Sequence, residues 1–422
     1  MRYSQHSRRG TVAVLVALCL VGMVGFVALA LDASLLFQDR RTAQAAADSA
    51  ALAAVGNLFL YYRTNQGLDV GGAAANEALT AAAANGFSND GVNSTVTVNI
   101  PPLSGDHVGQ AGYAEVIIVQ FQQRGFSAIW GSDPIPVKAR AVARGTWYPF
   151  NAGILVLDPT SSGSLSSNGG SFVTTNAKVI VDSNSSSATV VTGGGVLTAP
   201  EFDLTGIPGW NTSGGGAFNG PILSGQVPTP DPLAYLPEPD PSTMTVQSTK
   251  TVKLQNQGTL TLQPGVYQGG INVTGGNLTL APGIYYMDAG GFSFSGTGNL
   301  TAEGVMIVNS PAIKGSVNSD VISITGTGAI NISPMTTGIY QGISLWQARA
   351  ATNTLTVAGG GSGSISGTFY AQHGILKVSG GGGNSVGSQY ISWNITLSGN
   401  GNFTIAWDPN AVAPVKFLQI VE

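Results

Sequence analysis

The stretch "RRGTVAVLVALCLVGMVGFVALALDASLLFQDRRTAQAAADSAALAAVGNLF" at residues 8–59 decides the fold of the N-terminal part of the chain. Residues 11–31 are uncharged, and a helix of this length crosses roughly 30 Å of hydrocarbon. Residues 32–59 are rich in alanine and keep a helical period of apolar side chains. We therefore predict one continuous helix, which spans a membrane in its first half and packs on protein in its second.

The alanine-rich half has a predicted apolar face and predicted solvated faces. The charged side chains fall on the solvated faces, where they can stay in water. These solvated positions are Asp39, Arg40, Arg41 and Asp48. The apolar face comprises Leu35, Leu36, Ala43, Ala46, Ala47, Ala50 and Ala54.

The N-terminal motifs resemble a known family. The order "RRG", a long apolar helix, "ALALD" at 28–32 and "DRRTAQAAADSAALAA" at 39–54 is similar to the N-terminus of TadE/TadG-like proteins of the Flp (tight adherence) pilus-assembly system. A weaker resemblance continues through "EVIIVQFQQRGFSAIWGSDPIPVKARAVARG" at 115–145, which is similar to the small pilin-like region of such proteins. The resemblance implies a retained membrane helix, pilin-like or pilus-assembly subunits as partners, and a role in pilus assembly, adhesion or surface organisation.

The apolar run has other interpretations, which the sequence leaves open. The sequence "ALA" at 28–30 fits a signal-peptidase site, although the run is long for a signal peptide. A prepilin-type cut after Gly10 would call for an acidic residue where the chain has Leu15. Cys19 is the single cysteine and follows Leu18 rather than the Gly or Ala of a lipobox, so we interpret it as a small apolar residue of the helix.

Flanking charge predicts the orientation of the helix. Arg2, Arg8 and Arg9 precede it with no acidic residue among them. The positive-inside rule then places the N-terminus in the cytoplasm and the bulk of the chain in the periplasm or at the cell surface. We predict a single-pass protein of the inner membrane, with the lipid bilayer as its first partner.

Small residues in the apolar run suggest where another helix could pack. Ala13 and Ala17 form one such pair, and Gly22 and Gly25 form another. Small side chains allow close approach of helices within a bilayer. We predict that pilin-like or pilus-assembly subunits bind along these positions.

Residues 61–150 predict a small α+β unit of the pilin-like kind. Segment 72–85 is an alanine-rich helix ending at Asn85-Gly86, and segments 94–100, 114–121 and 135–146 alternate as strands. The last strand separates Lys138, Arg140 and Arg144 on one face from Val137, Ala139, Ala141 and Ala143 on the other.

From 151 to 422 the sequence predicts β structure throughout. Short runs rich in Val, Ile, Leu, Thr and Phe alternate with Gly, Asn and Ser. The segment "GTLTLQPGVY" at 258–267 recurs as "GNLTLAPGIY" at 276–285, and shorter copies follow. Such repeats favour a right-handed parallel β-helix, or β-solenoid, with roughly 20–28 residues per coil. The chain thus divides into regions 1–60, 61–150 and 151–422.

A proline-rich segment interrupts the β region. Residues 221–241, "PILSGQVPTPDPLAYLPEPDP", hold too many prolines for interior strands. They form either a linker between two β blocks or a loop strapped along one solenoid. The shared Gly/Ser/Thr-rich composition on both sides favours the strap.

The composition offers little for metal or nucleic-acid chemistry. Charged residues make up 9% of the chain and the net charge is −4, which leaves no electrostatic footprint for nucleic acid. The segment "VIVDSNSS" at 179–186 is similar to the Asp-x-Ser-x-Ser metal motif of von Willebrand A domains. However, Asn184 replaces the middle serine and no βαβ pattern follows, so we predict a turn between coils, no metal and no cofactor.

β-Helices also host polysaccharide lyases and hydrolases, which makes an enzyme the competing class. Arg349 and His373 are the only arginine and histidine after residue 151, and Asp288, Glu303 and Asp320 stand in no paired motif. We therefore predict a non-enzymatic protein without catalytic residues. An envelope-held carbohydrate-binding or polysaccharide-cleaving protein remains the alternative.

Aromatic residues in the β region bear on that alternative. They could form a face on which sugars stack, but at strand spacing aromatic side chains more often belong to a core. The residues concerned are Trp346, Trp393, Trp407, Tyr340, Phe369 and Tyr390.

Overall fold

The computed structural model describes residues 9–359, 361–380, 384–399 and 401–422, and in these ranges the chain forms two compact units. The helical unit comprises the chain up to Trp147 together with Lys416–Glu422. The solenoid unit comprises Tyr148–Val415. Arg2 and Arg8, on which the predicted orientation partly depends, lie outside the described residues.

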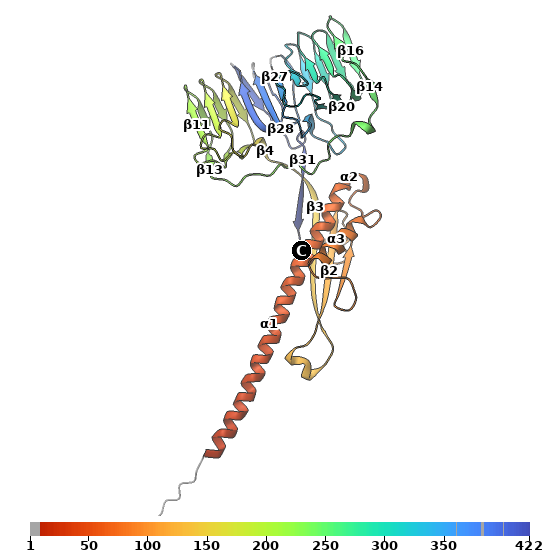
Figure 1. Ribbon diagram of the computed structural model, residues 1–422, viewed down its shortest axis with the longest axis vertical. Coiled ribbons are helices and arrows are strands. Elements are labelled where there is room, and N and C mark those ends of the chain that lie inside the picture. Colours follow the sequence, from red (N-terminus) through yellow and green to blue (C-terminus); the bar gives the residue numbers. More distant parts are fainter. Residues whose placement is uncertain (1–8, 360, 381–383, 400) are drawn as a thin grey trace, which may run out of the picture. The chain divides into compact units, whose positions relative to one another are not determined.

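The helical unit combines a long helix, α1 (Arg9–Leu60), with a small antiparallel sheet (Figure 1). The single helix predicted from the sequence is thus confirmed over the described residues 9–59. The other elements of this unit are α2 (Tyr62–Asn65), α3 (Ala73–Ala84), the 3-10 helix η1 (Phe126–Trp130), β1 (Ser94–Asn99), β2 (Tyr113–Gln122), β3 (Ile135–Pro149) and β31 (Pro414–Ile420).

Local capping fixes the ends of α3. The carboxylate of Asp69 accepts hydrogen bonds from the backbone N–H groups of Ala74 and Ala75, at 3.0 and 2.9 Å. At the other end the chain leaves the helix through Asn85 and Gly86, and Gly86 has a φ of +92°, a conformation that glycine adopts without strain. The predicted helix and its predicted end are confirmed.

The sheet has the strand order β1-β2-β3-β31. β1 and β2 pair antiparallel with Ser94 opposite Gln120, and β2 pairs with β3 with Tyr113 opposite Arg144. These are the three strands that the sequence predicts. The fourth strand, β31, differs from the prediction that the β region 151–422 forms one block: residues 416–422 return to the helical unit, where the N–H of Val421 donates to the carbonyl of Val142 at 2.8 Å.

Alanine dominates the core of the helical unit. Small side chains let α1 lie close to α3 and to the sheet, and they lose no rotamer entropy on burial. The buried alanines of this core are Ala43, Ala46, Ala47, Ala50, Ala51, Ala54, Ala74, Ala78, Ala82, Ala114, Ala139, Ala141 and Ala143. The prediction for Leu35 is wrong, since its side chain is 49% exposed. The buried positions of the predicted apolar face begin only at Ala43.

The solenoid unit is a parallel β-solenoid of about 11 turns in the described residues (Figure 1). A first run of coils contains β4 (Ala152–Val156), β5 (Leu165–Asn168), β6 (Phe172–Thr175), β7 (Lys178–Val181), β8 (Thr189–Thr192), β9 (Val196–Thr198), β10 (Phe202–Leu204), β11 (Trp210–Ser213), β12 (Ala217–Asn219) and β13 (Ile222–Ser224).

After the 3-10 helix η2 (Pro241–Thr243), a second run of coils follows. It contains β14 (Val246–Ser248), β15 (Val252–Leu254), β16 (Thr259–Leu262), β17 (Gly265–Tyr267), β18 (Ile271–Val273), β19 (Asn277–Leu280), β20 (Gly283–Asp288), β21 (Phe292–Phe294), β22 (Leu300–Ala302), β23 (Val305–Ser310), β24 (Ile322–Ile324), β25 (Ile330–Ile332), β26 (Ile343–Gln347), β27 (Thr354–Gly359), β28 (Thr368–Gly380), β29 (Gln389–Ser398) and β30 (Asn402–Ile405).

Stacked ladders of apolar side chains fill the solenoid. β16 pairs with β19 in parallel, with Leu260 beside Leu278 and Leu262 beside Leu280. The two copies of the sequence repeat are therefore neighbouring coils, as predicted. Fully buried aromatic residues add to the ladders. Phe292 of β21, for example, lies between Ile271 of β18 and Ile322 of β24.

The order of the coils in space is not their order in the sequence. The last coil of the second run lies on the first coil of the first run, since β29 pairs with β4 (Tyr390 beside Ile154) and β30 pairs with β6 (Phe403 beside Val173). Figure 1 shows β11 and β13 toward one end of the stack and β14 and β16 toward the other. The chain thus enters and leaves the solenoid near its middle.

The proline-rich segment connects the two ends of this one solenoid. Leu233 and Leu236 are buried against it, and the hydroxyl of Tyr370 donates to the carboxylate of Asp231 at 2.7 Å. Arg349 donates through Nη2 to the carbonyls of Leu233 and Leu236 at 3.0 and 2.8 Å. The strap predicted at 221–241 is confirmed from residue 225 on, whereas Ile222–Ser224 form strand β13 of the solenoid. Residues 225–243 are called the strap below.

Candidate functional site

The first half of α1 is an exposed apolar rod. Its large side chains from Val12 to Leu31 are about half to three-quarters exposed and contact little else in the described chain. By length and composition α1 is able to cross a membrane. Such exposure is unfavourable in water and favourable in lipid.

The predicted packing positions lie on this rod and face outward. Ala13, Ala17, Gly22 and Gly25 are all exposed. A methyl group added at Gly22 or Gly25 would meet no atom within 4 Å. Larger side chains are therefore tolerated by the chain itself at these two positions, and the role of all four residues in binding a partner stays a prediction.

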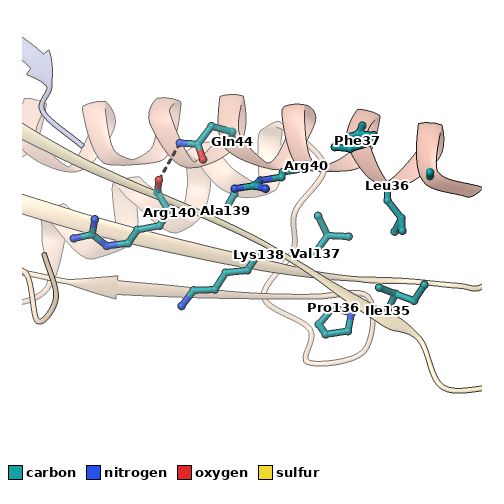
Figure 2. Close-up of a pocket in the computed structure, with 11 residues that line it drawn as sticks. Leu36, Phe37, Arg40, Gln44, Ile135, Pro136, Val137, Lys138, Ala139 and Arg140 are labelled. Carbon is teal, nitrogen blue, oxygen red and sulfur yellow. Dashed lines mark hydrogen bonds between the residues drawn. The ribbon is translucent and has the colours of Figure 1, made fainter.

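A groove lies between the beginning of the second half of α1 and strand β3. Figure 2 shows Leu36 and Phe37 of α1 on one side and Ile135 and Val137 of β3 on the other. Its volume is about 720 Å³. At one end Gln44 donates through Nε2 to the carbonyl of Arg140 at 2.9 Å, which ties the helix to the strand.

One cation, Arg40 of α1, lines this groove from the helix side, and the described lining contains no carboxylate, thiol or imidazole. Figure 2 shows the side chains of Lys138 and Arg140 pointing away from α1. Such a lining can bind an apolar segment or an anionic group but supplies no nucleophile or general base. The sequence analysis missed the groove because Leu36 was assigned to the packed face of the helix.

A buried acidic residue orders the sheet behind the groove. Glu115 is fully buried in β2, and its carboxylate accepts hydrogen bonds from Asn99, from Ser104 and, at 2.6 Å, from Arg140 Nε. Burial acts to raise the pKa of Glu115, but the hydrogen bonds outweigh it and lower the pKa to about 2. Arg140 also pairs with Glu422, so the same cation holds β31. The lone acid inside the apolar run 114–121 was the available signal for this cluster.

A second hollow, of about 350 Å³, lies between the strap and the solenoid. Asp182, Gln372, His373 and Trp393 line it together with strap residues. The carboxylate of Asp182 accepts a hydrogen bond from the N–H of Thr229 at 2.9 Å. Burial raises the pKa of Asp182 to about 6, although this hydrogen bond opposes the rise. The ring centroids of His373 and Trp393 lie 5.3 Å apart.

The motif at 179–186 and the lone arginine thus have structural roles. Asp182 follows strand β7 and binds the strap, and the segment after it is a turn between coils, as predicted. Arg349, considered above for an enzyme, anchors the strap and lies 5.2 Å from the centre of the Trp346 ring. Asp320 accepts hydrogen bonds from the backbone N–H groups of Gly290, Ala312 and Ile313.

Most of the aromatic residues considered for sugar stacking belong to the core. Trp346, Tyr340, Phe369 and Tyr390 are buried, which confirms the core interpretation for these four. Trp407 is half-buried and donates through Nε1 to the carbonyl of Phe150 at 2.9 Å. Among the described residues, no group of three or more His, Cys, Asp or Glu side chains could hold a metal ion together.

Comparison with known proteins bears on α1 alone. Residues 10–57 match the family model of putative Flp pilus-assembly TadE/G-like proteins. The N-terminal segment is TadE/G-like. This TadE/G-like segment lies wholly within α1 and includes both the exposed apolar half and the buried alanine half. No curated protein and no solved structure matches the chain.

Proposed function

We propose that this chain is a non-enzymatic, single-pass protein of the inner membrane that acts in pilus assembly, adhesion or surface organisation. The observation that carries the proposal is the two-part helix α1, which exposes an apolar half and buries an alanine half within one TadE/G-like segment. A helix of this kind anchors a folded unit at the membrane surface. The solenoid unit then lies on the extracytoplasmic side with the N-terminus in the cytoplasm.

The division of labour follows the three regions 1–60, 61–150 and 151–422, with the last strand returned to the middle region. The first anchors and binds pilin-like or pilus-assembly subunits, the second is a pilin-like body, and the third presents a solenoid surface. Polysaccharide at the cell surface is a further candidate partner of the third region.

Fractionation of the native cells and intact-mass measurement test the anchor. We expect a full-length chain in the membrane pellet that resists extraction at alkaline pH. A product beginning at Thr11 would indicate prepilin processing and a subunit role. A soluble product beginning at Leu31 would contradict the anchor.

Substitution of the small residues tests the partner. Gly22→Leu with Gly25→Leu should lower the recovery of pilin-like partners on co-purification by about tenfold or more, because bulky side chains prevent close helix approach. Since neither position meets another atom of this chain within 4 Å, the folded unit itself should be unaffected. Val27→Leu, on the opposite side of the helix, is the matched control. Unchanged recovery in the double variant would contradict this partner site.

The hollow beside the strap favours carbohydrate binding as a second candidate function. Trp393 is half-buried there and lies with Gln372, His373 and Asp182, a combination of one aromatic face with polar groups that suits a sugar ring. Glycan-array binding of the full chain, lost in Trp393→Ala and retained in Trp407→Ala, would support it. Binding that is equal in both variants, or absent from the unmodified chain, would contradict it.

A further inference from the structure

The loop between β2 and β3 presents large apolar side chains to solvent. Its 3-10 helix η1 has the sequence FSAIW, with Phe126 58% exposed and Ile129 79% exposed. Exposed apolar residues grouped on a loop, with no function inside the unit, are typical of a binding surface. We call residues 125–131 the apolar tip.

Hydrogen bonds attach the apolar tip to α1. The carboxylate of Asp32 accepts from the backbone N–H groups of Phe126 and Ser127, at 3.1 and 2.7 Å. The loop is closed at its base, where Arg124 Nε donates to the carbonyl of Asp133 at 2.8 Å. A Cβ at Gly125 would lie 2.5 Å from Asp32 Oδ1, so any larger residue there would displace the Asp32 carboxylate.

The position of Asp32 in α1 places the apolar tip beside the end of the uncharged run 11–31. Asp32 is the first charged residue after the uncharged run 11–31. Because an α-helix rises about 1.5 Å per residue, this carboxylate lies within one residue of the end of the apolar rod. The hydrogen bonds of Asp32 therefore hold Phe126 and Ser127 at the level where the apolar rod ends.

We propose that the apolar tip inserts into the interfacial region of the lipid bilayer that surrounds α1, as a second membrane contact of the helical unit. The occupant is lipid rather than protein because the tip is bonded to α1 where the proposed anchor ends, at the depth where aromatic and aliphatic side chains favour the headgroup boundary. This inference rests on the proposed membrane anchor. Its effect is to fix the tilt and rotation of the helical unit relative to the membrane, which a single helix leaves free.

Depth-dependent quenching of a fluorophore in lipid tests the insertion. The full-length chain carries one cysteine, so Cys19→Ala gives a background in which Ile129→Cys can be labelled with a polarity-sensitive fluorophore. Nanodiscs of phosphatidylethanolamine and phosphatidylglycerol, with and without brominated acyl chains, report contact with lipid. Val21→Cys, in the apolar rod, is the positive control, and Leu103→Cys, which is 72% exposed on the same unit, is the matched aqueous control.

We expect the labels at 21 and 129 to be quenched severalfold more strongly than the label at 103. Quenching at 21 without quenching at 129 would overturn the apolar tip as a membrane contact and leave the anchor intact. Absence of quenching at 21 would overturn the anchor itself.

The role of Asp32 is tested in the same background. Asp32→Ala should weaken quenching at 129 by about half or more, because the loop loses the acceptors of both N–H groups. Asp32→Asn keeps only one of the two acceptor oxygens and should give an intermediate value. Quenching in Asp32→Ala equal to that of the Asp32-containing background would show that these two hydrogen bonds do not position the tip.

Discussion

The helical unit and the solenoid unit bury apolar surface in opposite ways. The helical unit brings α1, α3 and the sheet together over small side chains, mostly alanine. The solenoid unit stacks leucine, isoleucine, phenylalanine and tyrosine in ladders that run from coil to coil. The helical unit also contains an ion pair between the buried Glu115 and Arg140, whereas buried polar side chains of the solenoid unit, such as Asn309 and Gln389, form hydrogen bonds. We therefore expect the alanine core of the helical unit to be destabilised mainly by larger side chains, and the core of the solenoid unit mainly by smaller ones.

The largest expected effect comes from removing volume in the solenoid. Phe292→Ala should cost about 3–5 kcal/mol, because a fully buried aromatic ring is replaced by a cavity. Since each coil contacts only its neighbours, faster hydrogen exchange should be confined to β18, β21 and β24, the strands that pair around Phe292. Phe172→Ala, at a half-exposed ring, is the control. Faster exchange across the whole solenoid would break the comparison.

Removing the cation of the helical unit should cost nearly as much. Arg140→Ala leaves Glu115 buried without its ionic partner, which we expect to cost about 3 kcal/mol at pH 7. The pKa of Glu115 in the folded state is about 2, below its ordinary value of 4.5. The ionised Glu115 therefore contributes its full share of the folding stability above pH 4.5, and this stability is lost as the pH falls toward 2.

The stability of the Arg140→Ala variant and that of the unmodified chain should therefore converge across this acidic range. Urea unfolding followed by hydrogen exchange of β2 and β3 measures both. Lys138→Ala, an exposed cation on the same strand, should change little at any pH. A constant difference down to pH 2 would show that the loss arises from packing rather than charge.

Adding volume to the alanine core sharpens the comparison from the other side. Ala50→Leu should cost about 2 kcal/mol, because α1 cannot approach α3 and the sheet as closely around a larger side chain. The exposed Ala45→Leu is the matched control in the same helix. Thermal unfolding of the helical unit measures both. Equal unfolding midpoints for the two variants would mean that the alanine core accommodates a leucine side chain without loss of stability.

The smallest expected effect concerns the attachment of the strap. Burial raises the pKa of Asp182 to about 6 in the folded state from an ordinary 3.8, so the protonated form favours folding and the attachment weakens as the pH rises from about 4 to 6. We expect a change of about 1 kcal/mol, read from hydrogen exchange of residues 228–233 after correction for the intrinsic rate. Asp182→Asn should abolish this pH dependence. A strap whose exchange is slower at pH 7 than at pH 4 would contradict the sign.

Much of the fold could be predicted where the signal is local. The uncharged run 11–31, the alanine period after it and the repeat at 258–285 each depend on residues a few positions apart, and α1, α3, β1 to β3 and the stacked coils all occur where expected. The prediction failed at Leu35, since an apolar period says that a face can be buried but not where the covering sheet begins.

The candidate sites were less accessible to sequence analysis. Both sites join residues about a hundred positions apart in the sequence. Leu36 and Val137 line the groove together, and Asp32 accepts a hydrogen bond from the N–H of Phe126. Asp32 was recognised only as the end of an apolar run, and Phe126 only as part of a family resemblance. Neither carries a signal that names the other, because the pairing depends on the length and register of the β2–β3 hairpin.

The sequence by itself determined that this chain has a membrane-length helix, a small α+β unit and a solenoid, because helical period, strand alternation and repeats are written in neighbouring residues. Only the tertiary structure decided that the last coil lies on the first, that the strap joins the two ends of one stack, and that residues 416–422 complete the sheet of the helical unit. The physical reason is that every coil offers similar ladders to its neighbours. The choice among these equivalent surfaces is made by contacts distant in sequence, such as those of Arg349 and Glu422.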